Sequence, residues 1–206
     1  MSGADGSIPL ALDGYTDLPP GHIANVVTYF EQRSPADGPG HPLPEGLAIA
    51  PMAPGRIDRY LAIYRRIGHD WMWFSRLAMP APVLAARLAD PACAVSFLMR
   101  GDEIVGLCEI RRAGSDVEVA MFGVVAEETG TGAAKGFLSA MLQACWQPPT
   151  ERVWLHTCTY DHPAAVHFYA RMGFRPFKFA IEVTSDPRLH GILPATAGPH
   201  VPLIRP

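Results

Sequence analysis

The sequence predicts an α/β fold with a mixed, mostly antiparallel central sheet flanked by helices, and with irregular, proline-rich arms at the N- and C-terminal ends. Two observations lead to this prediction. Apolar residues follow the helical period over 57–67 and 81–89 and the strand period over 94–124. Nine of the 21 prolines lie in residues 1–54 and five in 187–206, which leaves seven for the stretch between. We therefore expect the middle of the chain to form the packed domain.

Length and composition limit the class of protein. The 206 residues fit one ordinary domain rather than two of full size. Hydrophobic residues make up 49% and charged residues 18% of the chain, a balance that excludes a wholly disordered protein. A net charge of −3 and the lack of a Lys/Arg block argue against nucleic acid or a membrane as partner. We expect an N-terminal arm over 1–44, a domain over 45–185 and a tail over 186–206.

No targeting segment or metal site is expected. No basic region precedes an apolar run at the N-terminus, and nowhere do about 18 apolar residues follow one another, so we expect a cytoplasmic protein. The cysteines form no CxxC pair, and each lies within an apolar run. They are Cys93, Cys108, Cys145 and Cys158. They are expected to be small buried hydrophobic residues rather than zinc ligands.

The first half of the chain contains two strand signals and two helical ones. Residues 26–30 are all β-branched or aromatic, which predicts a strand within the arm. This strand could be an extra edge strand of the sheet. A short strand fits 47–50. Apolar residues then recur at helical spacing over 57–67 and over 81–89, so two helices should follow.

From residue 94 onward strands predominate. The turn residues Gly101 and Asp102 join two apolar runs, which predicts a β-hairpin that a third strand extends into a meander. The predicted elements are strands over 94–99, 104–110 and 117–124, a helix over 132–146, a strand over 152–158, a helix over 163–172 and a strand over 176–184. This order completes the prediction of a sheet with helices on its faces.

A Thr/Gly loop leads from the third strand of the meander into the next helix. Gly130 and Gly132 remove Cβ atoms where backbone must approach a ligand, and the first N–H groups of a helix have no intrahelical acceptor. The loop could therefore receive a phosphate oxygen. It lacks the GK[ST] ending of a P-loop and the GxGxxG spacing of a dinucleotide fold. On these residues alone, an ordinary turn is an equally open interpretation.

Three stretches resemble the GNAT superfamily of acyl-CoA-dependent N-acetyltransferases. They are Glu118-x-x-x-Phe122-Gly-Val124, then Gly130-x-Gly132 opening a helix, then His162-Pro-Ala-Ala165 followed by Tyr169 and Gly173-Phe174. The resemblance covers about residues 45–184 and includes the predicted order of elements. The run from His156 to Phe174 is most similar to a bacterial subgroup of small GNAT proteins of unassigned substrate.

The resemblance implies that acetyl-CoA is the acetyl donor and that no metal takes part. Phe122, Gly123 and Val124 would pair with the pantetheine arm. The pyrophosphate would be held by the loop and first helical turn, which comprise Thr129, Gly130, Thr131, Gly132, Ala133, Ala134 and Lys135. Glu127 departs from the family, which usually has Gln or Arg there. Its carboxylate should repel the pyrophosphate unless it turns outward or Lys135 compensates, although Glu127 could simply be a first-turn acid.

Tyr169 and Glu118 are the candidate catalytic residues. The resemblance implies that Tyr169 donates a proton to the departing thiolate, and the alternative is a tyrosine that only packs in the core. A substrate ammonium must lose a proton before it attacks, and Glu118, on the same strand face as Phe122 by simple alternation, is our candidate base. Glu118 could instead lie on a solvated face. His156 and water are the other candidate bases, and His156 could equally be a core residue.

The acceptor is expected to be a primary amine of a small molecule or peptide. Trp71, Trp73 and Phe74 gather after the first helix, where the resemblance implies the wall of the acceptor groove, but core packing would explain them equally well. Asp161 and His162 are expected to cap the next helix. The arms are a possible homodimer contact. A non-catalytic acyl-CoA-binding or regulatory module on the same fold is the alternative function.

Overall fold

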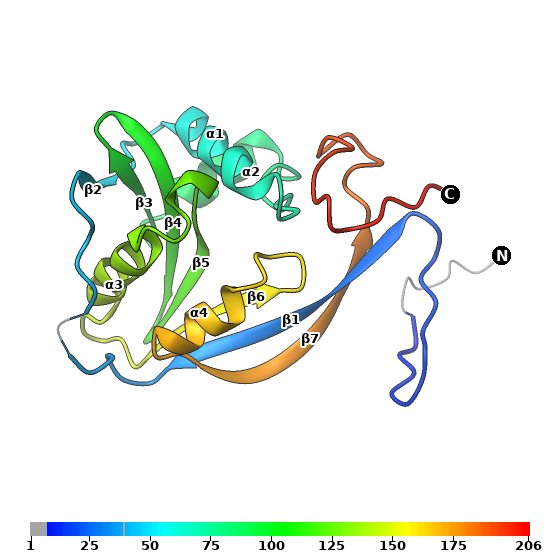
Figure 1. The fold of residues 1–206 in the computed structure, drawn as a ribbon, viewed down its shortest axis with the longest axis horizontal. Helices are drawn as coiled ribbons and strands as arrows, with labels where there is room; N and C mark the ends of the chain where they lie inside the picture. Colours follow the sequence, from blue (N-terminus) through cyan, green and yellow to red (C-terminus); the bar gives the residue numbers. More distant parts are fainter. Residues whose placement is uncertain (1–7, 39) are drawn as a thin grey trace.

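A computed structural model of the chain describes residues 8–38 and 40–206. It contains one seven-stranded sheet with the strand order β2-β3-β4-β5-β6-β1-β7 (Figure 1). The strands are β1 (His22–Gln32), β2 (Leu47–Pro51), β3 (Cys93–Arg100), β4 (Glu103–Ala113), β5 (Asp116–Val124), β6 (Arg152–Cys158) and β7 (Arg175–Ser185). The helices are α1 (Ile57–Gly68), α2 (Ala81–Ala89), α3 (Ala133–Cys145) and α4 (Ala165–Arg171). The predicted mixed, mostly antiparallel sheet flanked by helices and the predicted order of elements are confirmed.

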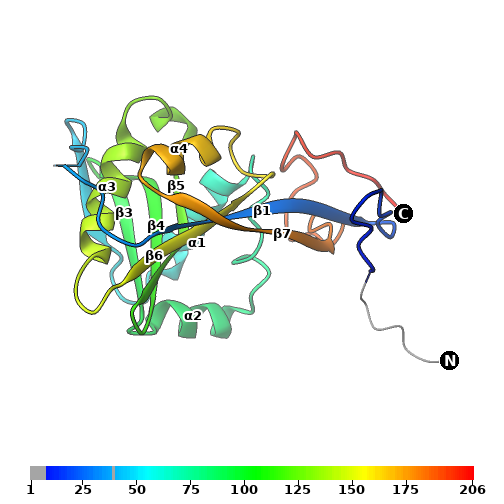
Figure 2. The same ribbon diagram turned by 90° about the horizontal axis from the view of Figure 1, so that it is seen from below.

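Helices cover both faces of the sheet (Figure 2). Glu109 of β4 binds side chains on and between α1 and α2, whereas Arg112, three residues on and so on the opposite face, donates to carbonyls of α3. The ring of Phe122 on β5 lies 5.5 Å from Phe137 of α3 and 6.1 Å from Phe168 of α4. Helices α1 and α2 therefore share one face, and α3 and α4 share the other.

The predicted edge position of the strand 26–30 is wrong. It is part of the eleven-residue strand β1, which pairs antiparallel with β6 on one side and with β7 on the other. Ile23, Val27 and Phe30 of β1 are buried, so the strand contributes to the core. The edge of the sheet at this end is β7. The strands β1 and β7 are about 150 residues apart in sequence, and the local composition of a strand does not identify so distant a pairing partner.

The C-terminal segment packs back onto the body of the protein. Arg188 and Asp186 form a buried ion pair with an Nη2–Oδ2 distance of 2.7 Å. The Arg188 guanidinium also donates to the carbonyl oxygens of Ala197, Val201 and Pro202. Apolar residues of this segment belong to a small buried cluster that is separate from the main hydrophobic core, here called the second buried cluster. Its members are Ile23, Met72, Tyr160, Leu193, Ala197 and Val201. The Arg188 side chain thus holds the C-terminal segment in a folded arrangement that packs against β1 and the α1–α2 connection.

Among residues 8–38 and 40–206, no helix combines the length and apolarity needed to cross a bilayer.

Candidate active site

β5 and β6 run side by side only at one end. They pair in parallel over 116–118 and 152–154 and then separate (Figure 1). On its other side β5 stays paired with β4, and the Val125 N–H donates to the Val105 carbonyl at 2.9 Å. Because backbone groups alternate in direction along an antiparallel strand, the amides of Phe122 and Val124 point away from β4. Polar backbone of β5 therefore faces the opening between the two strands.

The Thr/Gly loop ends at the N-terminus of α3. Gly130 and Gly132 have φ angles of 81° and 91°, a left-handed backbone that residues with side chains rarely adopt. A Cβ on Gly130 would meet nothing within 4 Å, so the space beside it is open. In the part of the chain that the structure describes, the amides of Ala134 and Lys135 have no acceptor. The loop thus presents directed N–H donors and open space, which suits a phosphate group.

The acids of this loop are held by arginines. Arg66 donates to Glu127 at 3.2 Å, and Arg100 donates to the two oxygens of Glu128 at 2.6 and 2.9 Å. A hydrogen bond from its own backbone amide, followed by that from Arg66, lowers the pKa of Glu127. The hydrogen bond from Arg100 lowers the pKa of Glu128 despite an opposing effect of burial. The Glu127 charge is therefore partly neutralised by Arg66, while Lys135 is exposed.

Tyr169 lies on α4, with its ring in the core. Its ring centroid is 6.1 Å from Phe30, 5.3 Å from Phe168 and 6.1 Å from Phe174. Burial strongly raises the pKa of Tyr169, and the negative charge of Asp161 adds to the increase. The phenol is therefore protonated throughout the physiological pH range. The packing alternative for Tyr169 is therefore observed, since its ring is buried among aromatic neighbours, and its catalytic role stays a prediction.

Asp161 has a different role from the predicted helix cap. Its Oδ2 accepts hydrogen bonds from Thr157 Oγ1 at 2.7 Å and from the Cys158 amide at 2.9 Å, and its Oδ1 accepts one from Trp73 Nε1 at 3.2 Å. A Cβ on Gly123 would come within 3.0 Å of the Trp73 ring, so this indole lies directly against β5. Asp161 and Trp73 together connect the separated ends of β5 and β6. His162 Nδ1 accepts a hydrogen bond from the Ala164 amide at 3.1 Å, but Ala164 is itself the N-cap residue of α4. Among the described residues no side chain caps the first turn of this helix, so the predicted cap is wrong for His162 as well.

Glu118 does not share a strand face with Phe122, so that part of the prediction is wrong. The β4–β5 register shifts by one residue at Ala120, and this bulge reverses the alternation beyond it. Phe122 faces α3 and α4, whereas Glu118 lies on the α1–α2 face, opposite Trp154 of β6. Glu118 therefore stands at the closed end of the opening, where β5 and β6 still pair. Its role as base stays a prediction.

His156 lies on the same face of the sheet as Glu118. It is exposed rather than buried, and its ring centroid is 5.5 Å from that of Tyr29 on β1. Two residues along β6 is Trp154, which pairs with Glu118. The core reading of His156 is therefore wrong, and His156 remains available as an alternative base.

The aromatic group after α1 is divided between two places. The Trp71 ring lies 5.0 Å from that of His162 and 5.6 Å from that of His200 in the tail. Trp73 lies against β5, and Phe74 packs on the second buried cluster. The three residues thus do not form one wall. Trp71 and Trp73 border the region near the end of β6, whereas Phe74 has a packing role.

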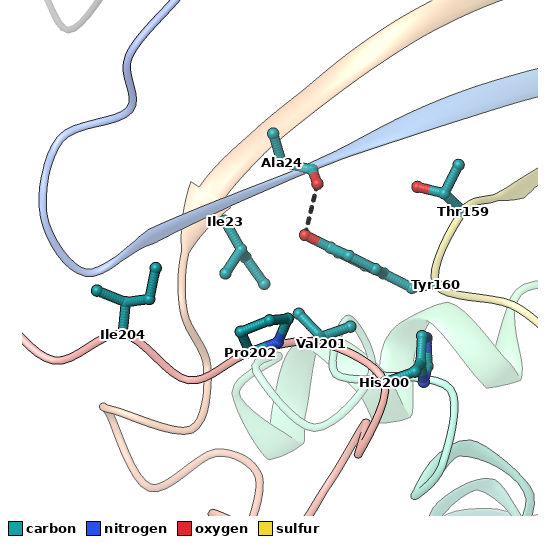
Figure 3. A pocket seen from close by; sticks show the side chains of 8 residues that line it. All are labelled: Ile23, Ala24, Thr159, Tyr160, His200, Val201, Pro202 and Ile204. Carbon is teal, nitrogen blue, oxygen red and sulfur yellow. Dashed lines mark hydrogen bonds between the residues drawn. The ribbon is translucent and has the colours of Figure 1, made fainter.

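Two surface pockets lie away from the Thr/Gly loop. One, of about 290 Å³, is formed by the tail, β1 and the turn after β6, and the Tyr160 hydroxyl beside it donates to the Ala24 carbonyl at 2.7 Å (Figure 3). The other, of about 460 Å³, lies along α4 at His167 and Arg171. Neither is lined by a residue of 129–134. The region between the diverging ends of β5 and β6 is the better candidate site, because amides of β5 point away from β4 there and two amides of the first turn of α3 have no acceptor among the described residues.

Solved structures share this fold at low sequence identity. A GCN5-related N-acetyltransferase from Sphaerobacter thermophilus has a TM-score of 0.57 at 18% identity, over 87% of this chain and 54% of that one. A functionally unknown conserved protein from Staphylococcus epidermidis has 0.53 at 14%, over 81% and 63%. An aminoglycoside acetyltransferase from an uncultured soil metagenomic sample has 0.52 at 16%, over 62% and 87%. The chain spans less than two thirds of the first two proteins.

A family model supplies the assignment that these likenesses alone do not give. No curated protein has significant similarity to the sequence. The model described as the Acetyltransferase (GNAT) family matches residues 60–174, more than half of the chain. The matched region includes β5, the Thr/Gly loop, α3 and Tyr169 on α4. The chain therefore belongs to the GNAT family of acetyltransferases.

Proposed function

We propose that the protein transfers the acetyl group of acetyl-CoA to a primary amine of a small molecule or peptide. Family membership supports acyl transfer in general. The observation that carries the more specific proposal is a set of backbone amides on both sides of the loop. Those of Phe122 and Val124 on β5 point away from β4, and those of Ala134 and Lys135 in the first turn of α3 have no acceptor among the described residues. A CoA thioester has polar groups for both sets, with amides and a carbonyl in its arm and a pyrophosphate at its far end.

The residues present fit such a donor. The amides of Ala134 and Lys135, with the open space beside Gly130, would hold the pyrophosphate, while Thr129, Thr131, Gly132 and Ala133 shape the loop. The amides of Phe122 and Val124 would pair with the pantetheine arm and polarise the thioester carbonyl. When bound, acetyl-CoA supplies the activated acetyl group. Because Gly123 has no side chain, the Trp73 ring lies directly against this end of β5.

The proposed reaction is a direct displacement. The amine nitrogen attacks the thioester carbon, a C–N bond forms and the C–S bond breaks. Glu118, directly or through water, removes the proton of the amine, and Tyr169 gives its proton to the leaving thiolate. Asp161 accepts a hydrogen bond from the Trp73 indole, which lies against β5, and this makes Asp161 a positioning residue. His156 is the alternative base.

Replacement of Gly132 with Val is expected to abolish detectable acetyl-CoA binding. The left-handed backbone at this position is strained for any β-branched residue, and a Cβ there would lie 3.7 Å from Pro44, so the loop that precedes α3 would be distorted. Isothermal titration calorimetry measures the effect. Gly55→Val is the matched control, because Gly55 also has a left-handed φ, of 76°, but lies before α1. Equal affinity in the two variants would disprove the placement of the pyrophosphate.

Replacement of Glu118 with Gln is expected to change the pH dependence of kcat/KM much more than the affinity for acetyl-CoA. A base acts on the amine, so its loss should remove the acidic limb of the profile, while the donor site stays intact. Steady-state kinetics from pH 6 to 9.5, together with calorimetry, provide both readouts. Glu45→Gln, at an exposed position before β2, is the control. Superimposable profiles for Glu118→Gln and wild type would move the base to His156 or water.

A non-catalytic acyl-CoA-binding module is the second candidate function. The departure at Glu127 favours it, but the pairing of Glu127 with Arg66 reduces that repulsion. Titration with acetyl-CoA followed by a thiol-release assay separates the two functions. The amine panel should contain polyamines, amino acids, peptides and aminoglycosides, the last because one structural neighbour is an aminoglycoside acetyltransferase. Binding without release for every amine would support the module.

The remaining parts of the proposal concern cellular context. A cytoplasmic location, no nucleic acid or membrane partner, no metal, and possible dimerisation through the arms all stay predictions from the sequence. In residues 8–38 and 40–206, no group of three or more His, Cys, Asp or Glu side chains is arranged to hold a metal ion.

A further inference from the structure

The strand β7 is an open edge of the sheet. Within residues 8–38 and 40–206 it pairs with β1 on one side only, and every residue of β7 except Ala180 and Thr184 is exposed. In Figure 1 it forms the outer margin of the sheet beyond β1. An edge strand of eleven residues presents a row of unpaired backbone N–H and C=O groups, which favours pairing with another strand.

Exposed apolar side chains on β7 also favour contact with a partner strand. Phe179, Ile181 and Val183 are 72%, 49% and 42% exposed, and alternation puts them on one face of β7. Val26 of β1, the Cα partner of Ile181, adds a fourth side chain, at 45% exposure. Such a stripe on an open edge is costly to leave in water.

The backbone features that discourage pairing lie at one end of the strand. Pro176 lacks an N–H, and the β1–β7 register shifts beside it. From Lys178 to Ser185 the ladder is regular, so this part of the edge is free to pair. A partner strand is therefore expected over the second half of β7.

The sequence of β7 is complementary to itself in one register. In an antiparallel pair around a two-fold axis at Ala180, position 178 of one copy lies opposite position 182 of the other, and 179 lies opposite 181. Lys178 then meets Glu182 twice, and Phe179 meets Ile181 twice. Moving the axis to 179 or 181 puts Lys178 opposite Ala180 or Thr184 and leaves both charges unpaired.

Both charged side chains are available for this contact. The Lys178 ammonium lies 4.2 Å above the ring of Tyr29, without an acid partner among the described residues. Glu182 Oε2 accepts a hydrogen bond from Asn25 Nδ2 at 2.9 Å, and its Oε1 has no hydrogen-bond donor among the described residues. The two charges lie on the opposite face of β7 from the apolar stripe. Apolar contacts on one face and ion pairs on the other would hold the strands in register.

We propose that two copies of the chain pair antiparallel through β7, with the axis at Ala180, so that one sheet runs through the dimer. The occupant of the edge is thus a second copy rather than another protein. This contact is distinct from the predicted contact through the arms, and it does not depend on the proposed catalytic mechanism.

Charge exchange tests the partner and the register together. Lys178→Glu alone would place two acids opposite each other, and Glu182→Lys alone would place two lysines opposite each other. Each single variant should therefore dimerise about tenfold or more weakly than wild type in sedimentation velocity experiments over a concentration series. An equimolar mixture of the two variants should regain dimerisation, since every 178–182 pair is then of opposite charge.

Control variants distinguish this surface from others. Leu12→Glu, on the exposed N-terminal arm, should leave dimerisation unchanged. Circular dichroism and thermal unfolding check that each variant folds, and Phe179→Asp replaces Glu182→Lys if loss of the Asn25 contact prevents folding. Three results would overturn the proposal. The wild-type protein could be a monomer at all concentrations, its dimer could be insensitive to changes in β7, or the Lys178→Glu and Glu182→Lys variants could fail to dimerise when mixed.

Discussion

Replacement of Tyr169 with Phe is expected to lower kcat by about 10- to 10⁴-fold, with little change in acetyl-CoA binding or in the fold. The ring packs against Phe30, Phe168 and Phe174, and Phe keeps those contacts. Only the hydroxyl is lost, and with it the proposed proton for the leaving thiolate. The smaller effect would apply if water partly replaces the donor. Because burial raises the pKa of Tyr169, its ionisation should not appear in the pH profile below pH 10.

The measurement needs an established amine substrate and conditions in which chemistry limits turnover. Pre-steady-state thiol release gives the chemical rate, and calorimetry gives the affinity for acetyl-CoA. Tyr60→Phe is the control, since Tyr60 is also a buried tyrosine but its hydroxyl binds Glu109 at 2.6 Å in the core. The control should lose stability and keep kcat. A wild-type chemical rate in Tyr169→Phe would make Tyr169 a packing residue.

Local patterns were sufficient to predict most of the fold. Helical spacing over 57–67 and 81–89 corresponds to α1 and α2, and the strand signals from 94 onward correspond to β3–β7 with bounds shifted by a few residues at most. Each of these signals depends on residues within one element. The position of β1 depends instead on pairing with segments more than 120 residues away, and the sequence contains no local sign of that choice.

The candidate site shows the same division between local and distant effects. The sequence predicted a Thr/Gly loop followed by a helix from residue 132, and α3 does begin at Ala133, after left-handed backbone at Gly130 and Gly132. Strand alternation failed for Glu118 because a bulge at Ala120 inserts one residue, and bulges have no reliable sequence signal. The contact between Asp161 and Trp73 joins residues 88 apart in sequence, so Asp161 could not be distinguished from a helix cap.

The core between the sheet and helices α1 and α2 contains a buried charged residue, Glu109, that no local sequence pattern indicated. Glu109 is fully buried on β4, where Arg76, Arg87 and Tyr60 donate to its carboxylate at 2.6 to 3.0 Å. Burial alone would raise the pKa of Glu109, but the hydrogen bonds and charge of Arg76, with those of its neighbours, lower it overall. The carboxylate therefore remains charged in the folded protein.

Replacement of Glu109 with Gln is expected to lower the free energy of unfolding at pH 7 by about 3–5 kcal/mol, because Arg76 would be left buried without a counter-charge. The wild-type contribution also depends on pH. A carboxyl whose pKa is lower in the folded state stabilises the fold above the unfolded value, near pH 4.3, and loses that effect as pH falls through the folded value. The difference in unfolding free energy between wild type and Glu109→Gln should therefore shrink in acid.

Urea unfolding at pH 7 and between pH 5 and 3 measures both effects. The control is Glu103→Gln, which breaks the exposed ion pair with Arg66 and is expected to cost at most about 1 kcal/mol. Equal stability of the two variants at pH 7 would mean that Arg87 or water compensates fully for the lost charge.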